Sequence, residues 1–194
     1  MSAGRAATLG AGLAIALFAS PAAALLLADI AATLAAVDAS RARFSDVRTI
    51  AALGTPIERR GTLAYARPGR LEMVVEAPVA ERLTIADGKL TVEARGATRV
   101  VDLATQEPLF AWIEGIRATL AGDETALRRH FEPSVSGTLA GWSLGLVPRD
   151  LRLRSIVARI TIAGERERIR SIEIDEVSGD RSVMTILPMG AAAK

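Results

Sequence analysis

The stretch LEMVVEAPVAERLTIADGKLTVEA, residues 71–94, determines the fold class of this chain. Apolar and polar residues alternate in it, and a period of two places alternate side chains on opposite faces of a β-strand. Asp87-Gly88 favours a two-residue type I′ turn, because both central residues of that turn need a positive φ. We therefore predict antiparallel strands with one apolar and one solvated face. The apolar face would carry Leu71, Met73, Val75, Leu83, Ile85, Leu90 and Val92.

Alternation of this kind extends through most of the chain. It begins near Phe44 and returns, after an interruption, in residues 135–139, 142–147, 155–163, 168–177 and 181–187, with Gly164 and residues 178–180 as predicted turns. A single twisted sheet of roughly ten strands tends to curl or to split. A curled sheet has a concave apolar face that must be covered.

Two helical segments are available to cover that face. Residues 25–44 carry apolar side chains at helical spacing, whereas residues 106–122 begin near Pro108 and end at Gly122. A short helix capped by Asp123 should follow. Periodicity does not decide whether these helices pack on a filled core or close over a cavity. The apolar stripe of the second segment consists of Leu109, Trp112, Ile113, Ile116 and Leu120.

Residues 1–24 have the pattern of a secretory signal peptide. Arg5 is followed by an apolar run from Leu9 to Ala19, then by Pro21 and an alanine-rich cleavage site. The run is shorter than the roughly 20 residues that a membrane-spanning helix needs. We expect a cleaved leader, a single domain over residues 25–194, and a periplasmic location.

Composition excludes several function classes. The formal net charge is +2, with 24 basic and 22 acidic residues spread along the chain, so no basic patch for nucleic acid is predicted. The chain has no cysteine and one histidine, His130, which argues against a zinc site. No cofactor is expected. The arginine-rich stretch RDLRLR, residues 149–154, is interpreted as a solvated strand or loop face.

One motif raises the alternative of an esterase. GWSLG, residues 141–145, fits the G-x-S-x-G pattern of a nucleophile elbow. That motif acts at a sharp strand-to-helix turn and needs a histidine later in the chain, but His130 precedes it. Trp142, Leu144 and Leu146 also alternate as in a continuous strand. We therefore expect a strand here and no enzyme.

Four segments together resemble a known family. They are ARFSDVRTIAALGTPIERRGTLAYARPGRLEMVVEAP, LTIADGKLTVEARG, GWSLGLVP and IRSIEIDEVSGDRSVMTILP, and their order and spacing are similar to those of the outer-membrane lipoprotein carrier (LolA-like) family, in its LolA-related branch. The resemblance implies an α+β, mainly antiparallel β fold: an incomplete, unclosed β-barrel of about ten or eleven strands with a helical lid. It also implies transport of acylated cargo across the periplasm.

The same resemblance gives a role to Arg67. In the lipoprotein carriers an arginine directly before the proline of this strand faces the cavity and hydrogen-bonds the lid, and Arg67-Pro68 matches that position. An unsatisfied guanidinium in an apolar cavity is costly, so an opened lid would weaken cargo binding. The alternative is that Arg67 lies at a strand tip and extends to solvent.

The resemblance implies a monomeric carrier whose partners are an acylated cargo, an inner-membrane exporter and an outer-membrane acceptor. Asp46 replaces a glutamine common in the carriers, and little chain follows Leu187, so a lipoprotein, a glycolipid, a free fatty acyl species and another lipid all remain open as cargo. A filled-core scaffold for a lipid or pigment export system is the rival hypothesis. The expected ligand-binding residues are Leu63, Tyr65, Arg67, Leu71, Met73, Val75, Leu83, Ile85, Leu90, Val92, Leu109, Trp112, Ile113, Ile116, Trp142 and Leu144.

Overall fold

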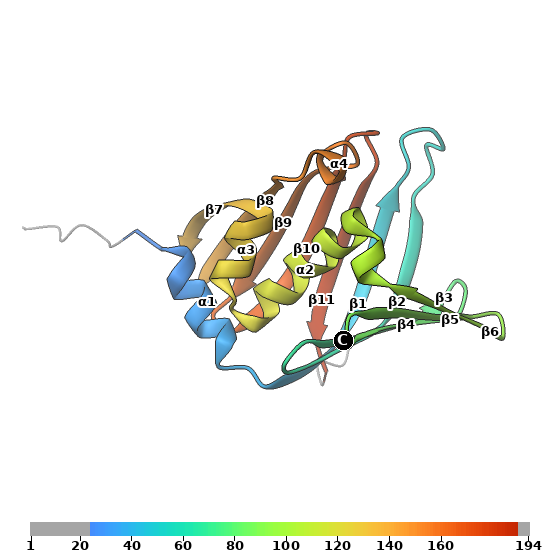
Figure 1. Ribbon diagram of the computed structural model, residues 1–194, viewed down its shortest axis with the longest axis horizontal. Coiled ribbons are helices and arrows are strands. Elements are labelled where there is room, and N and C mark those ends of the chain that lie inside the picture. Colours follow the sequence, from blue (N-terminus) through green and yellow to red (C-terminus); the bar gives the residue numbers. More distant parts are fainter. Residues whose placement is uncertain (1–23, 190–194) are drawn as a thin grey trace, which may run out of the picture.

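The computed structural model describes residues 24–189, except for the side chains of residues 107–109. The predicted signal peptide therefore lies almost entirely outside the described residues. Eleven strands form one antiparallel sheet in the order β6-β5-β4-β3-β2-β1-β11-β10-β9-β8-β7 (Figure 1). Their bounds are β1 Ala39–Thr49, β2 Ile57–Ala66, β3 Arg70–Ala77, β4 Glu81–Ala86, β5 Lys89–Ala94, β6 Ala97–Asp102, β7 Phe131–Thr138, β8 Gly141–Pro148, β9 Val157–Glu165, β10 Arg168–Glu176 and β11 Arg181–Pro188.

The sheet curls without closing, which confirms the predicted unclosed barrel. The first and last strands, β1 and β11, pair at its centre, and β6 and β7 form its two separate edges. The predicted apolar face of the first half is also confirmed, because Met73 lies opposite Leu83 and Ile85 opposite Leu90 in antiparallel pairs. Asp87 and Gly88 have φ of 50° and 72° in the turn between β4 and β5, as a type I′ turn requires.

The longer helices lie together on one side of the curved sheet (Figure 1). The helical elements are α1 Leu27–Ala35, the 3₁₀ turn η1 Leu103–Thr105, α2 Glu107–Ala121, α3 Glu124–His130 and α4 Leu151–Arg154. As predicted, α2 has a proline in its first turn and ends at Gly122, and the side chain of Asp123 caps α3 by accepting a hydrogen bond from the Ala126 amide. None of the helices within residues 24–189 is long and apolar enough to cross a membrane.

Three expectations about element bounds were wrong. The first helix ends at Ala35 rather than continuing toward Phe44, because the chain already enters β1 at Ala39. The stretch RDLRLR contains α4, which the Asp150 side chain caps by accepting from the amides of Arg152 and Leu153. Gly164 is inside β9 rather than in a turn, and it lies against the Trp142 ring, which leaves no room for a Cβ atom.

The concave face is filled at both ends by separate apolar clusters. The first cluster joins α1, α3 and the edge of α2 to β7, β8 and β9, and it includes Ile30, Leu34, Leu127, Phe131, Trp142, Leu144, Leu146, Ile160 and Ile162. The second joins the start of α2 and η1 to β4, β5 and β6 through Leu90, Leu103 and Ile113. Trp112 packs against both clusters. Neither cluster includes a residue of the central strands β1, β2, β3 and β11, whereas Ile172 and Ile174 of β10 pack against the first cluster.

Candidate ligand-binding cavity

A cavity of about 470 Å³ lies over the central strands, between the two apolar clusters. Its volume is within the range of small-molecule binding sites. The α2 helix contributes Trp112, Ile113 and Ile116, and strands β2 to β5 contribute the opposite wall. Of the residues expected from the sequence, the cavity wall contains Leu63, Tyr65, Leu71, Met73, Leu83, Ile85, Leu90, Trp112, Ile113 and Ile116.

Other expected ligand-binding residues do not line the cavity. Trp142 and Leu144 belong to the first apolar cluster, where α1 and α3 already cover their strand. Val75 is buried opposite Gly61, and Val92 packs against the second cluster. The predicted alternation was correct for all four. Helical residues cover Trp142, Leu144 and Val92, whereas Val75 is buried in the sheet opposite Gly61 and belongs to neither cluster. The side chain of Leu109 lies outside the described residues.

The sequence argument missed the contribution of the last two strands. Alternation predicted that residues 168–177 and 181–187 form strands, but it did not show that β10 and β11 lie next to β1 beneath the cavity. The lid also contributes apolar side chains from α1 and from the last turn of α2. The additional apolar lining residues are Leu34, Val37, Ala42, Ala64, Leu120, Ile169, Ile172, Ile174, Met184, Ile186 and Pro188.

Arg67 is placed beside the lid rather than inside the cavity. Its guanidinium donates from Nε to the Val37 carbonyl at 3.3 Å and from Nη2 to the carbonyls of Ala35 and of Ala121, the latter at 3.3 Å. It also pairs with Asp38 at 3.6 Å. These carbonyls lie at the C-terminal ends of α1 and α2, where cations are favourable. Arg67, directly after β2, is therefore hydrogen-bonded to the C-terminal ends of both helices.

A second arginine connects α2 to the sheet. Arg117 pairs with the buried Glu114 one turn earlier in α2, and its Nη1 lies 3.5 Å from the Pro68 carbonyl in the turn after β2. The hydrogen bond to Glu114 raises the pKa of Arg117, so its charge is retained at any physiological pH. The lid thus contacts the β2–β3 turn through two guanidinium groups.

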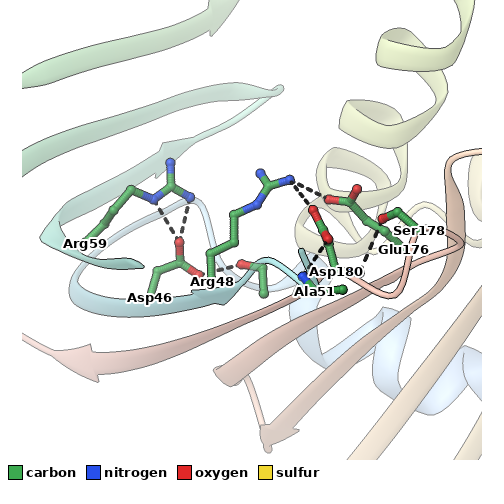
Figure 2. Close-up of polar contacts among 8 residues, drawn as sticks. Asp46, Arg48, Ala51, Arg59, Glu176, Ser178 and Asp180 are labelled. Atoms are coloured by element: carbon green, nitrogen blue, oxygen red, sulfur yellow. Dashed lines mark hydrogen bonds and ion pairs between the residues drawn. The ribbon is translucent and has the colours of Figure 1, made fainter. Parts of the chain in front are cut away.

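A polar group interrupts the apolar wall near the other end of β2. The fully buried Asp46 on β1 accepts hydrogen bonds from Nε and Nη2 of Arg59 at 2.9 and 2.6 Å, as shown in Figure 2. Its other oxygen accepts from the Ser182 hydroxyl at 2.6 Å. Arg59 and Ser182 line the cavity. The sequence argument identified Asp46 only as a departure from a family pattern and did not select Arg59 or Ser182.

Two further polar atoms at the cavity wall lack partners. Tyr65 Oη and Trp112 Nε1 are buried without a hydrogen-bond partner among the described residues. By contrast, Trp142 Nε1 donates to the Arg166 carbonyl at 2.9 Å. A buried donor without a partner costs about 1–3 kcal/mol, so the closed lid carries an energetic penalty at these two positions.

The geometry does not favour catalysis by the residues considered from the sequence. GWSLG lies inside the extended strand β8, so Ser143 is not presented at a strand-to-helix turn. Within residues 24–189, no group of three or more histidine, aspartate or glutamate side chains is arranged to hold a metal ion. The site is a mainly apolar cavity under helices, whose wall also includes the charged residues Arg41, Arg59, Glu72, Glu167, Arg168 and Arg170.

Comparison with known proteins gives one family. The family model described as outer membrane lipoprotein carrier protein LolA-like matches residues 19–194. No match was found among curated proteins. Similar solved structures include a LolA superfamily protein of Nitrosomonas europaea, at 10% identity over 88% of this chain and 96% of that one, with a TM-score of 0.46. Another is the lipoprotein LppX of Mycobacterium tuberculosis, at 5% identity over 87% and 97%, with a TM-score of 0.43.

Proposed function

This chain belongs to the LolA-like family of outer membrane lipoprotein carrier proteins, and on that premise we propose that it is a periplasmic carrier. It binds the acyl chains of a lipid or lipoprotein in the cavity under α2 and carries them toward the outer membrane. The observation that supports this proposal is the cavity itself, about 470 Å³ in volume and lined mainly by aliphatic side chains. A scaffold with a filled core would not contain it.

A carrier must bind its cargo reversibly. Burial of acyl chains contributes about 0.8 kcal/mol per methylene, so two chains of roughly 14 carbons would contribute on the order of 20 kcal/mol. That affinity is too high for release. We propose that Arg67 lowers it, because cargo that separates the lid from β2 breaks the hydrogen bonds to the carbonyls of Ala35, Val37 and Ala121.

The remaining parts of the proposal concern the cellular setting. Residues 1–24 act as a cleaved signal peptide, and residues 25–194 form the single functional domain in the periplasm. The cargo comes from an inner-membrane exporter and passes to an outer-membrane acceptor. The protein acts by binding and release, without a chemical step.

Native mass spectrometry of the mature protein, purified from a periplasmic extract, tests this function. A carrier should show a mass excess that matches a lipid or an acylated species, or should take up added lysolipid. Unmodified mass together with no uptake of fatty acids or lysolipids would contradict the carrier and favour a scaffold that acts through partner proteins.

A further inference from the structure

The polar group of Asp46, Arg59 and Ser182 has the properties of a ligand subsite inside the cavity. Asp46 has no exposed surface, and both of its carboxylate oxygens are engaged by Arg59 and Ser182. Breaking a buried ion pair is strongly unfavourable, so Asp46 fixes the position of the Arg59 guanidinium. An arginine held in this way presents its remaining donors in a constant geometry at the cavity wall.

The Arg59 guanidinium has hydrogen-bond donors that Asp46 does not use. A guanidinium carries five N–H groups, and the two hydrogen bonds to Asp46 use two of them. Arg59 makes no other hydrogen bond or ion pair within the described part of the chain. Its side chain is 33% exposed and lines the cavity, so an acceptor atom of a ligand can reach the unused donors.

The surrounding charges favour an uncharged acceptor over an anion. Arg48, two residues from Asp46 on β1, pairs with Glu176 at 2.9 Å and with Asp180 at 3.7 Å (Figure 2). Arg48 and Arg59 therefore face three carboxylates, and no excess of positive charge remains next to Asp46; the other charged residues that line the cavity are Arg41, Arg168 and Arg170, together with Glu72 and Glu167. A neutral carbonyl oxygen can accept a hydrogen bond from Arg59 without electrostatic repulsion from these carboxylates.

We propose that Arg59 is a recognition site for the ester or amide carbonyl through which the acyl chain of the cargo is attached. This inference rests on the proposed carrier function and defines the class of its cargo. The chain of the ligand lies on the aliphatic wall formed by residues such as Ile172, Ile174 and Met184, and its carbonyl accepts from the Arg59 guanidinium. Linked acyl chains are thereby preferred over free fatty acids.

Two lipids that differ in one carbonyl test the site. Displacement of the fluorescent hydrocarbon diphenylhexatriene from the mature protein would be measured with 1-palmitoylglycerol, an ester, and with 1-O-hexadecylglycerol, the matching ether. We expect the ester to bind about ten-fold more tightly, as one hydrogen bond to a charged donor allows. Palmitate should bind less tightly than the ester.

The double substitution Asp46→Leu with Arg59→Met removes the pair without leaving a buried charge, and it should abolish the preference for the ester. Arg82→Met, at an exposed arginine outside the cavity, is the matched control and should retain the preference. If the double variant does not fold, Arg59→Lys keeps a cation beside Asp46 and should reduce the preference.

The outcomes separate this inference from the carrier function. Equal affinity of the wild-type protein for ester and ether would overturn the carbonyl site while leaving the carrier intact. Tighter binding of palmitate than of the ester would also overturn it, in favour of an anion site. If neither the hydrocarbon nor any of the lipids binds, the proposed carrier function itself fails.

Discussion

At the scale of single residues, Arg67 is the strongest candidate for control of release. Replacement by leucine removes the donors that hold the ends of α1 and α2 in the empty protein. Hydrogen bonds to charged groups contribute about 1.5–3 kcal/mol each, so we expect Arg67→Leu to bind acyl lipids at least ten-fold more tightly. The rate of lipid transfer to acceptor vesicles should fall in proportion, which a fluorescent acyl lipid can report.

A matched control for this variant is Arg82→Leu. Arg82 is also an arginine on a strand of the first half of the sheet, but it pairs with Glu72 and, among the described residues, has no hydrogen bond to the lid. Its replacement should leave both affinity and transfer rate within a factor of two. Normal release by Arg67→Leu would show that Arg67 only stabilises the fold.

Replacing Tyr65 with phenylalanine should stabilise the protein, whereas the same substitution at a hydrogen-bonded buried tyrosine usually destabilises it. Its hydroxyl is buried without a hydrogen-bond partner in the described part of the chain, so Tyr65→Phe removes an unsatisfied group and little else. We expect a gain of about 1 kcal/mol in the free energy of unfolding, or roughly 2–4 °C in Tm. Trp142→Phe should lower Tm, because Trp142 Nε1 donates to the Arg166 carbonyl. A lower Tm for Tyr65→Phe would mean that its hydroxyl has a partner in solution.

The sequence predicted which side chains share the concave face, but it did not predict which of them border the cavity. Met73 and Trp142 both belong to that face, yet Met73 lines the cavity and Trp142 lies in the core. Alternation depends only on the local period of a strand, whereas the cavity depends on where helices from distant segments rest. The contact of Asp46 with Arg59 and Ser182 could not be predicted either, because it joins residues of three different strands.

At the scale of elements, Gly122 sets the spacing between the two lid helices. It ends α2 with φ of 67°, and a Cβ atom there would lie 2.2 Å from the Ala31 carbonyl oxygen and 2.8 Å from the Ala35 Cβ in α1. Gly122→Ala should therefore destabilise the protein through backbone strain and through displacement of α1. We expect a loss of about 3 kcal/mol or more in the free energy of unfolding, measured by urea denaturation.

Gly88→Ala separates the two causes. Gly88 has a similar φ of 72°, but a Cβ atom there would meet no atom of the described residues within 4 Å. This substitution should cost only the left-handed backbone penalty, about 1–2 kcal/mol. Equal losses in the two variants would contradict a close contact between α2 and α1 at Gly122.

The elements themselves were predicted unevenly. The α2 and α3 helices carry local signals, Gly122 and Asp123, and their bounds followed from them. The α4 helix is a single turn that begins after the cap at Asp150. The arginine-rich sequence of this stretch was interpreted as a strand or loop face, so the helix was not predicted. The pairing of β1 with β11 joins the two ends of the chain, and no local pattern encodes a contact at that separation.

At the scale of the whole molecule, the cavity exists because two apolar clusters fill the ends of the concave face and leave about 470 Å³ between them. The chain has two tryptophans, and they distinguish these regions. Trp112 lines the cavity, whereas Trp142 is 2% exposed in the first cluster. In a carrier, bound cargo would change the surroundings of Trp112 and leave those of Trp142 unchanged.

We therefore expect Trp142→Phe, which retains Trp112, to change its tryptophan emission when acyl lipid is added. Trp112→Phe, which retains Trp142, should keep its emission constant over the same titration. Both variants should gain thermal stability with lipid, by about 2.7 kcal/mol at a hundred-fold excess over Kd, because ligand binds only the folded state. An emission change confined to Trp142 would place the ligand in the first cluster instead of the cavity and would contradict the proposed binding site.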